Sequence, residues 1–225
     1  MSNTINVLIA EDEPIIIDLL KNIFKQLSNS NRDWNFKLHT TQNCDAAIKK
    51  IDEAIMGKPF DLALLDINLP PSKQRNISSG EDLGLELRRY FPKVKIIIYT
   101  SNNDNYRLNN ILKSINPDGF LIKSDIDYKG FVKAITRVII NPPYYSPSIL
   151  CLIRQHITDD FFLDSIDRTL LHEISKGTKT KDLINFVNLS KSGVELRKRR
   201  LKEIFNIAEK GNKKLIQIAK EKGYV

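Results

Sequence analysis

The stretch VLIAEDEPI, residues 7–15, carries an apolar run directly into three consecutive carboxylates and a proline. A short run of aliphatic and β-branched residues that stops at a polar turn is typical of a buried strand. Further runs of this kind follow along the first half of the chain. Together with the first, they are INVLIA (5–10), NFKLHT (35–40), FDLALLD (60–66), VKIIIYT (94–100) and DGFLIK (118–123). The sequence therefore predicts five strands.

Segments of helical length and period separate these runs, and another follows the last run. They are IIIDLLKNIF (15–24), DAAIKKIDEAI (45–55), GEDLGLELRRYF (80–91), NYRLNNILKSI (105–115) and YKGFVKAITRVII (128–140). Strict alternation of strand and helix predicts a parallel sheet that is covered by helices on both faces.

Beyond residue 140 the strand pattern stops. NPPYYSPS (141–148) holds three prolines and predicts a linker, followed by a helix near residues 149–156. Only helical periodicity remains after it. We therefore expect a first domain over 1–140, a linker over 141–160 and a helical domain over 161–225.

The net charge of +8 is concentrated in the last domain. From residue 160 to the end, the chain has 15 basic and 9 acidic residues, a net charge of +6. No apolar stretch approaches the roughly 18 residues of a membrane helix, and the N-terminus lacks the pattern of a signal peptide. The two cysteines and three histidines are isolated, so they indicate neither a disulfide framework nor a metal site. The sequence predicts a soluble, cytoplasmic protein with no membrane partner.

Polar residues close most of the predicted strands, and the carboxyl ends of parallel strands are where ligands bind in such sheets. These residues are Glu11 and Asp12, Asp66, Thr100 and Ser101, and Lys123. Converging carboxylates suit a hard divalent cation such as Mg²⁺, and one of them can attack a phosphoryl group as a nucleophile. A lysine and a hydroxyl nearby can hold the phosphoryl oxygens. Taken singly, the acids before Pro14 also suit a helix start, and Asp66 a turn.

Residues 1–140 resemble the receiver domain of two-component response regulators. The resemblance rests on Glu11–Asp12 and on the motifs LLDINLP (64–70), IIIYTS (96–101) and GFLIK (119–123). It implies a flavodoxin-like fold with a five-stranded parallel sheet in the order 2-1-3-4-5. It also implies that Asp66 accepts a phosphoryl group from a sensor histidine kinase.

The resemblance assigns roles to the other strand-end residues. Mg²⁺ would be bound by Asp12, Asp66 and the backbone carbonyl of Asn68, with Glu11 acting through water. The phosphoryl-binding and switch residues would be Thr100, Ser101, Phe120 and Lys123. Asn68 also argues against an aspartate-nucleophile phosphatase of the haloacid dehalogenase type, which needs a second aspartate at that position.

Two features depart from the receiver pattern. Ser124 stands where the family often has a proline after the lysine, and PSKQRNISSG (71–80) inserts residues before the third helix. This insertion is either a tolerated surface loop or a device in which Lys73 or Arg75 tunes kinase choice or phosphoryl lifetime.

The last domain contains a basic helix that we predict from Lys191 to about Phe205. KTKDLINFV (179–187) predicts a second short helix before it, and Ser190 can cap the basic helix. A short helix, a tight turn and a basic helix match the helix-turn-helix plan. The segment resembles the LuxR/NarL-type helix-turn-helix domain, which implies DNA binding.

The residues expected to face DNA are Ser192, Glu195, Leu196, Lys198, Arg199 and Lys202. Gly193 and Glu195 depart from the family pattern, so a protein-interaction output stays open as the alternative to DNA binding. The sequence thus predicts a response regulator rather than an enzyme, with a histidine kinase and DNA as partners. We expect it to form a homodimer when it is phosphorylated.

Overall fold

The computed structural model describes residues 3–72, 75, 77–101, 104–158, 163–205, 207 and 211–225. By their internal contacts, the residues divide into two compact units. One comprises Met1–Asn103 and Ile111–Ile149, and the other comprises Asp104–Asn110 and Leu150–Val225.

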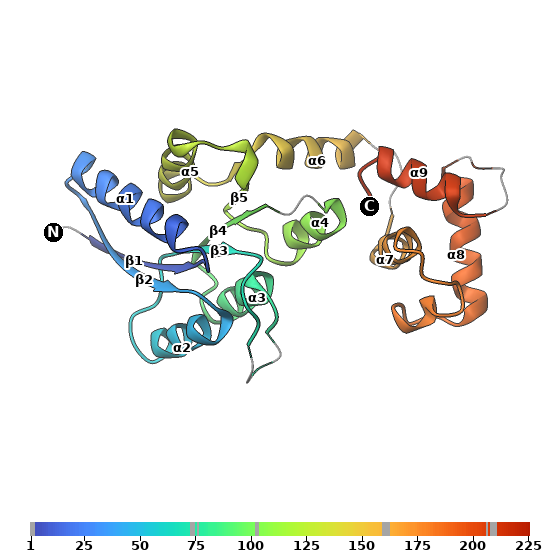
Figure 1. The fold of residues 1–225 in the computed structure, drawn as a ribbon, viewed down its shortest axis with the longest axis horizontal. Coiled ribbons are helices and arrows are strands. Elements are labelled where there is room, and N and C mark those ends of the chain that lie inside the picture. The colour runs from blue at the N-terminus through green and yellow to red at the C-terminus, as the bar shows by residue number, and fades with distance from the viewer. Residues whose placement is uncertain are drawn as a thin grey trace. The chain divides into compact units, whose positions relative to one another are not determined.

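The first unit is built on a parallel sheet of six strands in the order β2-β1-β3-β4-β5-β6 (Figure 1). The strands are β1 (Asn3–Ala10), β2 (Trp34–Thr41), β3 (Leu62–Asp66), β4 (Lys95–Thr100), β5 (Gly119–Ile122) and β6 (Tyr144–Tyr145). The predicted strands and the order 2-1-3-4-5 are confirmed. The central strands are enclosed by the sheet and its helices, so every residue of β3 and β5 is buried.

The sheet has one strand more than the five predicted. β6 pairs with β5 in parallel, although its residues lie in the predicted linker. The Tyr144 amide donates to the Asp118 carbonyl at 2.9 Å, and the Ser146 amide donates to the Phe120 carbonyl at 3.0 Å. These bonds satisfy backbone groups on the edge of β5, and two residues are too few for a periodic signal in the sequence.

Helices cover both faces of the sheet. They are α1 (Pro14–Ser30), α2 (Cys44–Ile55), α3 (Gly80–Tyr90) and α5 (Tyr128–Ile140). The residues of a further helix, α4 (Asn105–Ser114), are divided between the two units. α1 and α5 lie together on one face, and α2 and α3 on the other (Figure 1). Local chemistry sets several starts: Pro14 occupies the first turn of α1, and the side chains of Asn43, Ser79 and Asp127 cap α2, α3 and α5.

The second unit holds only helices among its described residues. After α6 (Pro147–Thr158) come α7 (Ser165–Ser175), the 3₁₀ turn η2 (Leu183–Asn185), α8 (Lys191–Ile204) and α9 (Lys213–Glu221). Leucines of α7, α8 and α9 share one apolar core with Val194 and Phe205. The predicted basic helix is confirmed as α8, capped by the Ser190 side chain.

The short helix predicted over residues 179–187 is only the single turn η2 in the structure. Asp182 and Asn185 in this segment have low helix propensity, which favours a turn over a longer helix. In the part of the chain that the structure describes, no helix is long and apolar enough to cross a membrane.

Candidate functional site

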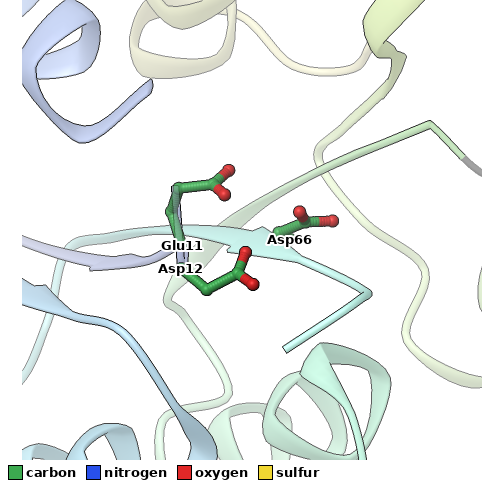
Figure 2. Close-up of side chains that lie close together, drawn as sticks. All are labelled: Glu11, Asp12 and Asp66. Atoms are coloured by element: carbon green, nitrogen blue, oxygen red, sulfur yellow. The ribbon is translucent and has the colours of Figure 1, made fainter. Parts of the chain in front are cut away.

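Three carboxylates gather where β1 and β3 end. Glu11 and Asp12 directly follow β1, and Asp66 is the last residue of β3 (Figure 2). One oxygen from each carboxylate lies within 4.8 Å of one oxygen from each of the others. Glu11 is fully buried and Asp66 is 3% exposed, whereas Asp12 is open to solvent. The cluster therefore combines two buried acids with one that is accessible.

Backbone contacts fix the two buried acids. The Glu11 amide donates to the Thr41 carbonyl at 3.0 Å, and the Glu13 amide donates to Glu11 Oε1 at 3.0 Å. The Asn68 amide donates to Asp66 Oδ1 at 3.2 Å. These contacts hold each carboxylate by one oxygen and leave the other oxygen for a further partner.

Gly80 lets α3 begin against the end of β3. Its amide donates to the Ile67 carbonyl at 3.1 Å. A Cβ at this position would lie 1.8 Å from the Asp66 carbonyl oxygen. Any larger residue would therefore displace the backbone of Asp66.

Lys123 is the cation of the cluster. Its Nζ lies 2.8 Å from Asp66 Oδ2, 3.1 Å from Glu11 Oε2 and 3.7 Å from Glu13 Oε1. Burial alone would lower the pKa of Lys123, but its bonds to Asp66 and Glu11 outweigh burial and raise that pKa. Lys123 thus stays charged and offsets the repulsion between the buried carboxylates of Glu11 and Asp66.

Burial also raises the pKa of Glu11. The Tyr99 hydroxyl, the Glu13 amide and Lys123 each act in the opposite direction and only partly offset burial. A further positive charge beside Glu11 would favour its ionised form.

The remaining predicted residues take different positions at the same end of the sheet. Thr100 is fully buried at the end of β4, and Ser101 after it is exposed. Phe120 is fully buried in β5. Asn68 is exposed beside Asp66, so its carbonyl belongs to the same turn as the cluster.

The donor set fits a hard divalent cation. Oxygen is the ligand atom that Mg²⁺ prefers, and Mg²⁺ is usually bound through one or two carboxylates while it keeps several waters. Exposed Asp12 gives access to such an ion, and Asp66 gives a buried ligand. The same arrangement places the Lys123 ammonium next to an Asp66 oxygen, where it can neutralise a phosphoryl group.

Sequence reasoning missed Tyr99, which it treated only as part of a strand. The side chain is fully buried, and its hydroxyl is the one buried side-chain polar atom of the described residues that has no hydrogen bond of ordinary geometry. Burial raises the pKa of Tyr99 well above its usual value, and the nearby Glu11 carboxylate adds to this shift. Strand alternation was the available signal, since it places Tyr99 on the face opposite Thr100.

The insertion before α3 makes defined contacts to α2. Arg75 pairs with Asp52 through two nitrogens, at 2.8 and 3.3 Å, and the Ser72 hydroxyl donates to Asp45. Both members of the Arg75–Asp52 pair are about half exposed, so the pair contributes little stability. Lys73 lies outside the described residues.

Most of the side chains expected to face DNA do lie on the surface of α8. Ser192, Glu195, Leu196 and Arg199 are exposed, and Lys202 is half-buried. The expectation that Lys198 projects outward is not met. Lys198 is 9% exposed, and its Nζ donates to the Thr180 hydroxyl at 2.8 Å.

The spacing of the helix explains this difference. Lys198 lies four residues after Val194 and three before Leu201, and both of these are fully buried. The lysine stem therefore packs on the core side of α8. Arg197, which the sequence reasoning did not single out, bonds Asp164 at 2.6 Å and Asp167 at 3.1 Å, and so ties α8 to the start of α7.

Comparison with known proteins covers both units. The family model "Response regulator receiver domain" matches residues 7–135. Among solved structures, RcsB from Salmonella enterica serovar Typhimurium bound to promoter P1flhDC in the presence of phosphomimetic BeF3⁻ is similar, with 17% identity and a TM-score of 0.61. That likeness covers 99% of this chain and 100% of that one.

Two further structures of RcsB give similar values. RcsB in the structure of two dimers bound to two parallel DNAs is 19% identical to this chain, with a TM-score of 0.62. RcsB in the structure of the RcsB–DNA complex is also 19% identical to this chain, with a TM-score of 0.60. Each covers 92% of this chain and 94% of that one. At these identities the likeness shows a common fold. No curated protein sequence matches the chain.

Proposed function

Because the chain belongs to the response regulator receiver family, we propose that phosphorylation of Asp66 switches it as a DNA-binding regulator of transcription. In this proposal Asp66 receives the phosphoryl group from a sensor histidine kinase. The N–P bond of the kinase phosphohistidine breaks as a bond forms from phosphorus to an Asp66 carboxylate oxygen. The histidine nitrogen keeps the electron pair. The protein is thus a substrate and a switch rather than an enzyme.

The contact between Lys123 and Asp66 carries the proposal. At 2.8 Å from Asp66 Oδ2, the ammonium lies where a new phosphoryl oxygen would gain a positive partner. Thr100 and Ser101, at the end of the neighbouring strand, would supply hydroxyl donors to the same group. Inward movement of Thr100 would open space for Phe120 to turn, and this is the switch that we propose.

Glu11, Asp12, Asp66 and the carbonyl of Asn68 would hold Mg²⁺, with Glu11 acting through water. When bound, the ion neutralises charge that builds up between the carboxylates and the phosphoryl oxygens. The chain's own residues do the rest: Asp66 provides the attacking oxygen, and Lys123 holds the product. The Asn68 amide keeps the Asp66 carboxylate in position, and Gly80 leaves room for the Asp66 backbone.

We propose that the helical domain, over residues 161–225, delivers the output by placing α8 in the major groove of DNA. The receiver would then span residues 1–140 and the linker 141–160. Arg199 and Lys202 would contact phosphates, while Ser192, Glu195 and Leu196 would face base edges. RcsB, with the same fold, has been captured on DNA as dimers and with a phosphomimetic. By analogy we propose a phosphorylated homodimer. We also propose that the protein is located in the cytoplasm.

One observation favours a protein-interaction output as the second candidate. Three large apolar side chains of the helix-turn-helix are exposed: Ile184 at 42%, Phe186 at 51% and Leu196 at 57%. Exposed apolar residues on a small domain are typical of surfaces that bind other proteins. In this reading, phosphorylation would control a partner protein rather than a promoter.

The test is genome-wide crosslinking and sequencing of DNA bound by the wild type and by Asp66→Asn. We expect a shared motif that the wild type occupies strongly and the variant weakly. Asp18→Asn, an exposed carboxylate change on α1, is the matched control and should behave as the wild type. Absence of enriched sites for the wild type would reject the DNA output. Equal occupancy by Asp66→Asn would reject phosphorylation as the switch.

A further inference from the structure

The Tyr99 hydroxyl is buried and makes no hydrogen bond of ordinary geometry. Its ring packs in the core between the sheet, α1 and α5, with the Phe131 ring at 5.4 Å. Phenylalanine would fill the same space without burying a polar group, and a buried hydroxyl without a partner destabilises a fold. We therefore expect the hydroxyl to form a hydrogen bond in another state of the protein.

Glu11 and Lys123 flank this side chain. The Glu11 carboxylate lies beside the Tyr99 hydroxyl, and the Lys123 ammonium lies 5.1 Å from the centre of the Tyr99 ring. In the present arrangement Glu11 Oε1 is bonded by the Glu13 amide and Oε2 by Lys123. Each carboxylate oxygen has two lone pairs, so Glu11 can accept one more donor.

A phosphoryl group on Asp66 would compete with Glu11 for the Lys123 ammonium. Its ammonium now donates hydrogen bonds to Asp66 and Glu11 and lies 3.7 Å from a Glu13 oxygen. Turning toward phosphoryl oxygens would weaken its bond to Glu11. Glu11 is fully buried, and a buried carboxylate that loses its cation is strongly unfavourable.

We propose that Tyr99 is a positioning residue: its hydroxyl donates to the Glu11 carboxylate when Lys123 turns to the phosphoryl group on Asp66. This inference rests on the proposed function and deepens it. Tyr99 would then hold Glu11 in place beside Asp12 and Asp66, the residues that would hold Mg²⁺. A cavity of about 150 Å³, lined in part by Tyr99, Lys123 and Phe131, gives the side chains room for this exchange.

The proposal separates two states that one variant can compare. Tyr99→Phe removes the hydroxyl and keeps the ring. Without Mg²⁺ or phosphomimetic, the variant should be at least as stable as the wild type, because the lost hydroxyl makes no hydrogen bond of ordinary geometry there. With Mg²⁺ and BeF3⁻, it should bind the phosphomimetic about tenfold more weakly, because a hydrogen bond to a charged group is lost.

The experiment titrates full-length protein with BeF3⁻ at saturating Mg²⁺ by calorimetry and measures urea unfolding of the unliganded protein. Tyr90→Phe, which removes an exposed hydroxyl on α3, is the control and should bind as the wild type. In a Glu11→Gln background, Tyr99→Phe should add much less than its tenfold effect, because the two groups act together.

Equal affinity of Tyr99→Phe and wild type would overturn the inference. So would a loss of affinity that comes with an equal loss of stability in the unliganded protein, since that pattern indicates a packing role. If the wild type itself fails to bind BeF3⁻ with Mg²⁺, then the proposed phosphorylation site fails, and this result is distinct from failure at Tyr99 alone.

Discussion

Replacing Lys123 by methionine should destabilise the metal-free receiver strongly, and Mg²⁺ should restore much of the loss. Methionine keeps an unbranched apolar stem and removes the ammonium that bonds Glu11 and Asp66. Both carboxylates are buried, so the change leaves them without a cation. Removing one partner of a buried ion pair costs about 3–5 kcal/mol.

The lower end of that range applies here. The Lys123 side chain is 20% exposed, and the neighbouring Asp12 opens the cluster to water. We therefore expect a loss of about 3 kcal/mol in the free energy of unfolding. With a urea dependence of about 2 kcal/mol per molar, this corresponds to a midpoint lowered by about 1.5 M. Mg²⁺ at about 100 times its dissociation constant should return roughly 2.7 kcal/mol to the variant.

The single tryptophan of the chain, Trp34 in β2, packs against the core of the first unit and reports its unfolding by fluorescence. Urea titrations with and without Mg²⁺ give the free energies. Lys129→Met, at an exposed position of α5, is the control and should leave the midpoint unchanged. If Lys123→Met and the wild type unfold at the same urea concentration without divalent cation, then Lys123 does not compensate the buried acids. If Mg²⁺ leaves the unfolding midpoint of Lys123→Met unchanged, the carboxylates of the variant do not bind it.

Three regions of the molecule give further predictions. Arg199→Ala combined with Lys202→Ala should weaken DNA binding and reduce the slope of log affinity against log salt by about 2, measured by fluorescence anisotropy; an unchanged slope would remove α8 from the interface. Partial burial would raise the pKa of Asp164, but bonds from the amide at 167 and from the α8 arginine hold it below its usual 3.8. Its contribution to stability is thus present above pH 3.8 and is lost as the pH falls through the folded-state value. Asp164→Asn keeps the cap of α7 and should abolish this acid-side loss, whereas Asp164→Ala should also cost about 1 kcal/mol in thermal unfolding at neutral pH. Gly193→Ala should stabilise α8 by about 0.5–1 kcal/mol, because the added Cβ meets its nearest neighbour at an ordinary 3.4 Å; hydrogen exchange that is faster in the variant would contradict this. Asp125→Ala should speed hydrogen exchange of the amide at 148, because Asp125 accepts from the Ser148 amide at 2.9 Å; an unchanged exchange rate would contradict this.

The sheet and the acidic cluster could be predicted because both follow from period and from sheet geometry. Apolar runs at regular intervals define parallel strands, and parallel strands bring their carboxyl ends to one edge. Asp66 and Glu11 therefore meet although 55 residues separate them in the sequence. No knowledge of side-chain contacts is needed for this step.

Features that depend on a single contact were not predictable in the same way. β6 is a two-residue strand held by backbone bonds, which leave no pattern in the side chains. Arg197 finds Asp167 only after α7 and α8 have packed. Lys198 is different, since its spacing from Val194 and Leu201 marks the inner face of the helix and its charge obscured that signal.

The short strand β6 also decides where the first unit can be cut from the rest of the chain. A fragment that ended at residue 140 would lose the amides that bond the Asp118 and Phe120 carbonyls. It would also lose the Ser146 hydroxyl, to which the Ile122 amide donates at 3.1 Å. An uncovered strand edge is a template for pairing with another chain. Such a fragment should therefore associate edge to edge, whereas one that continues through residue 149 carries its own protective strand.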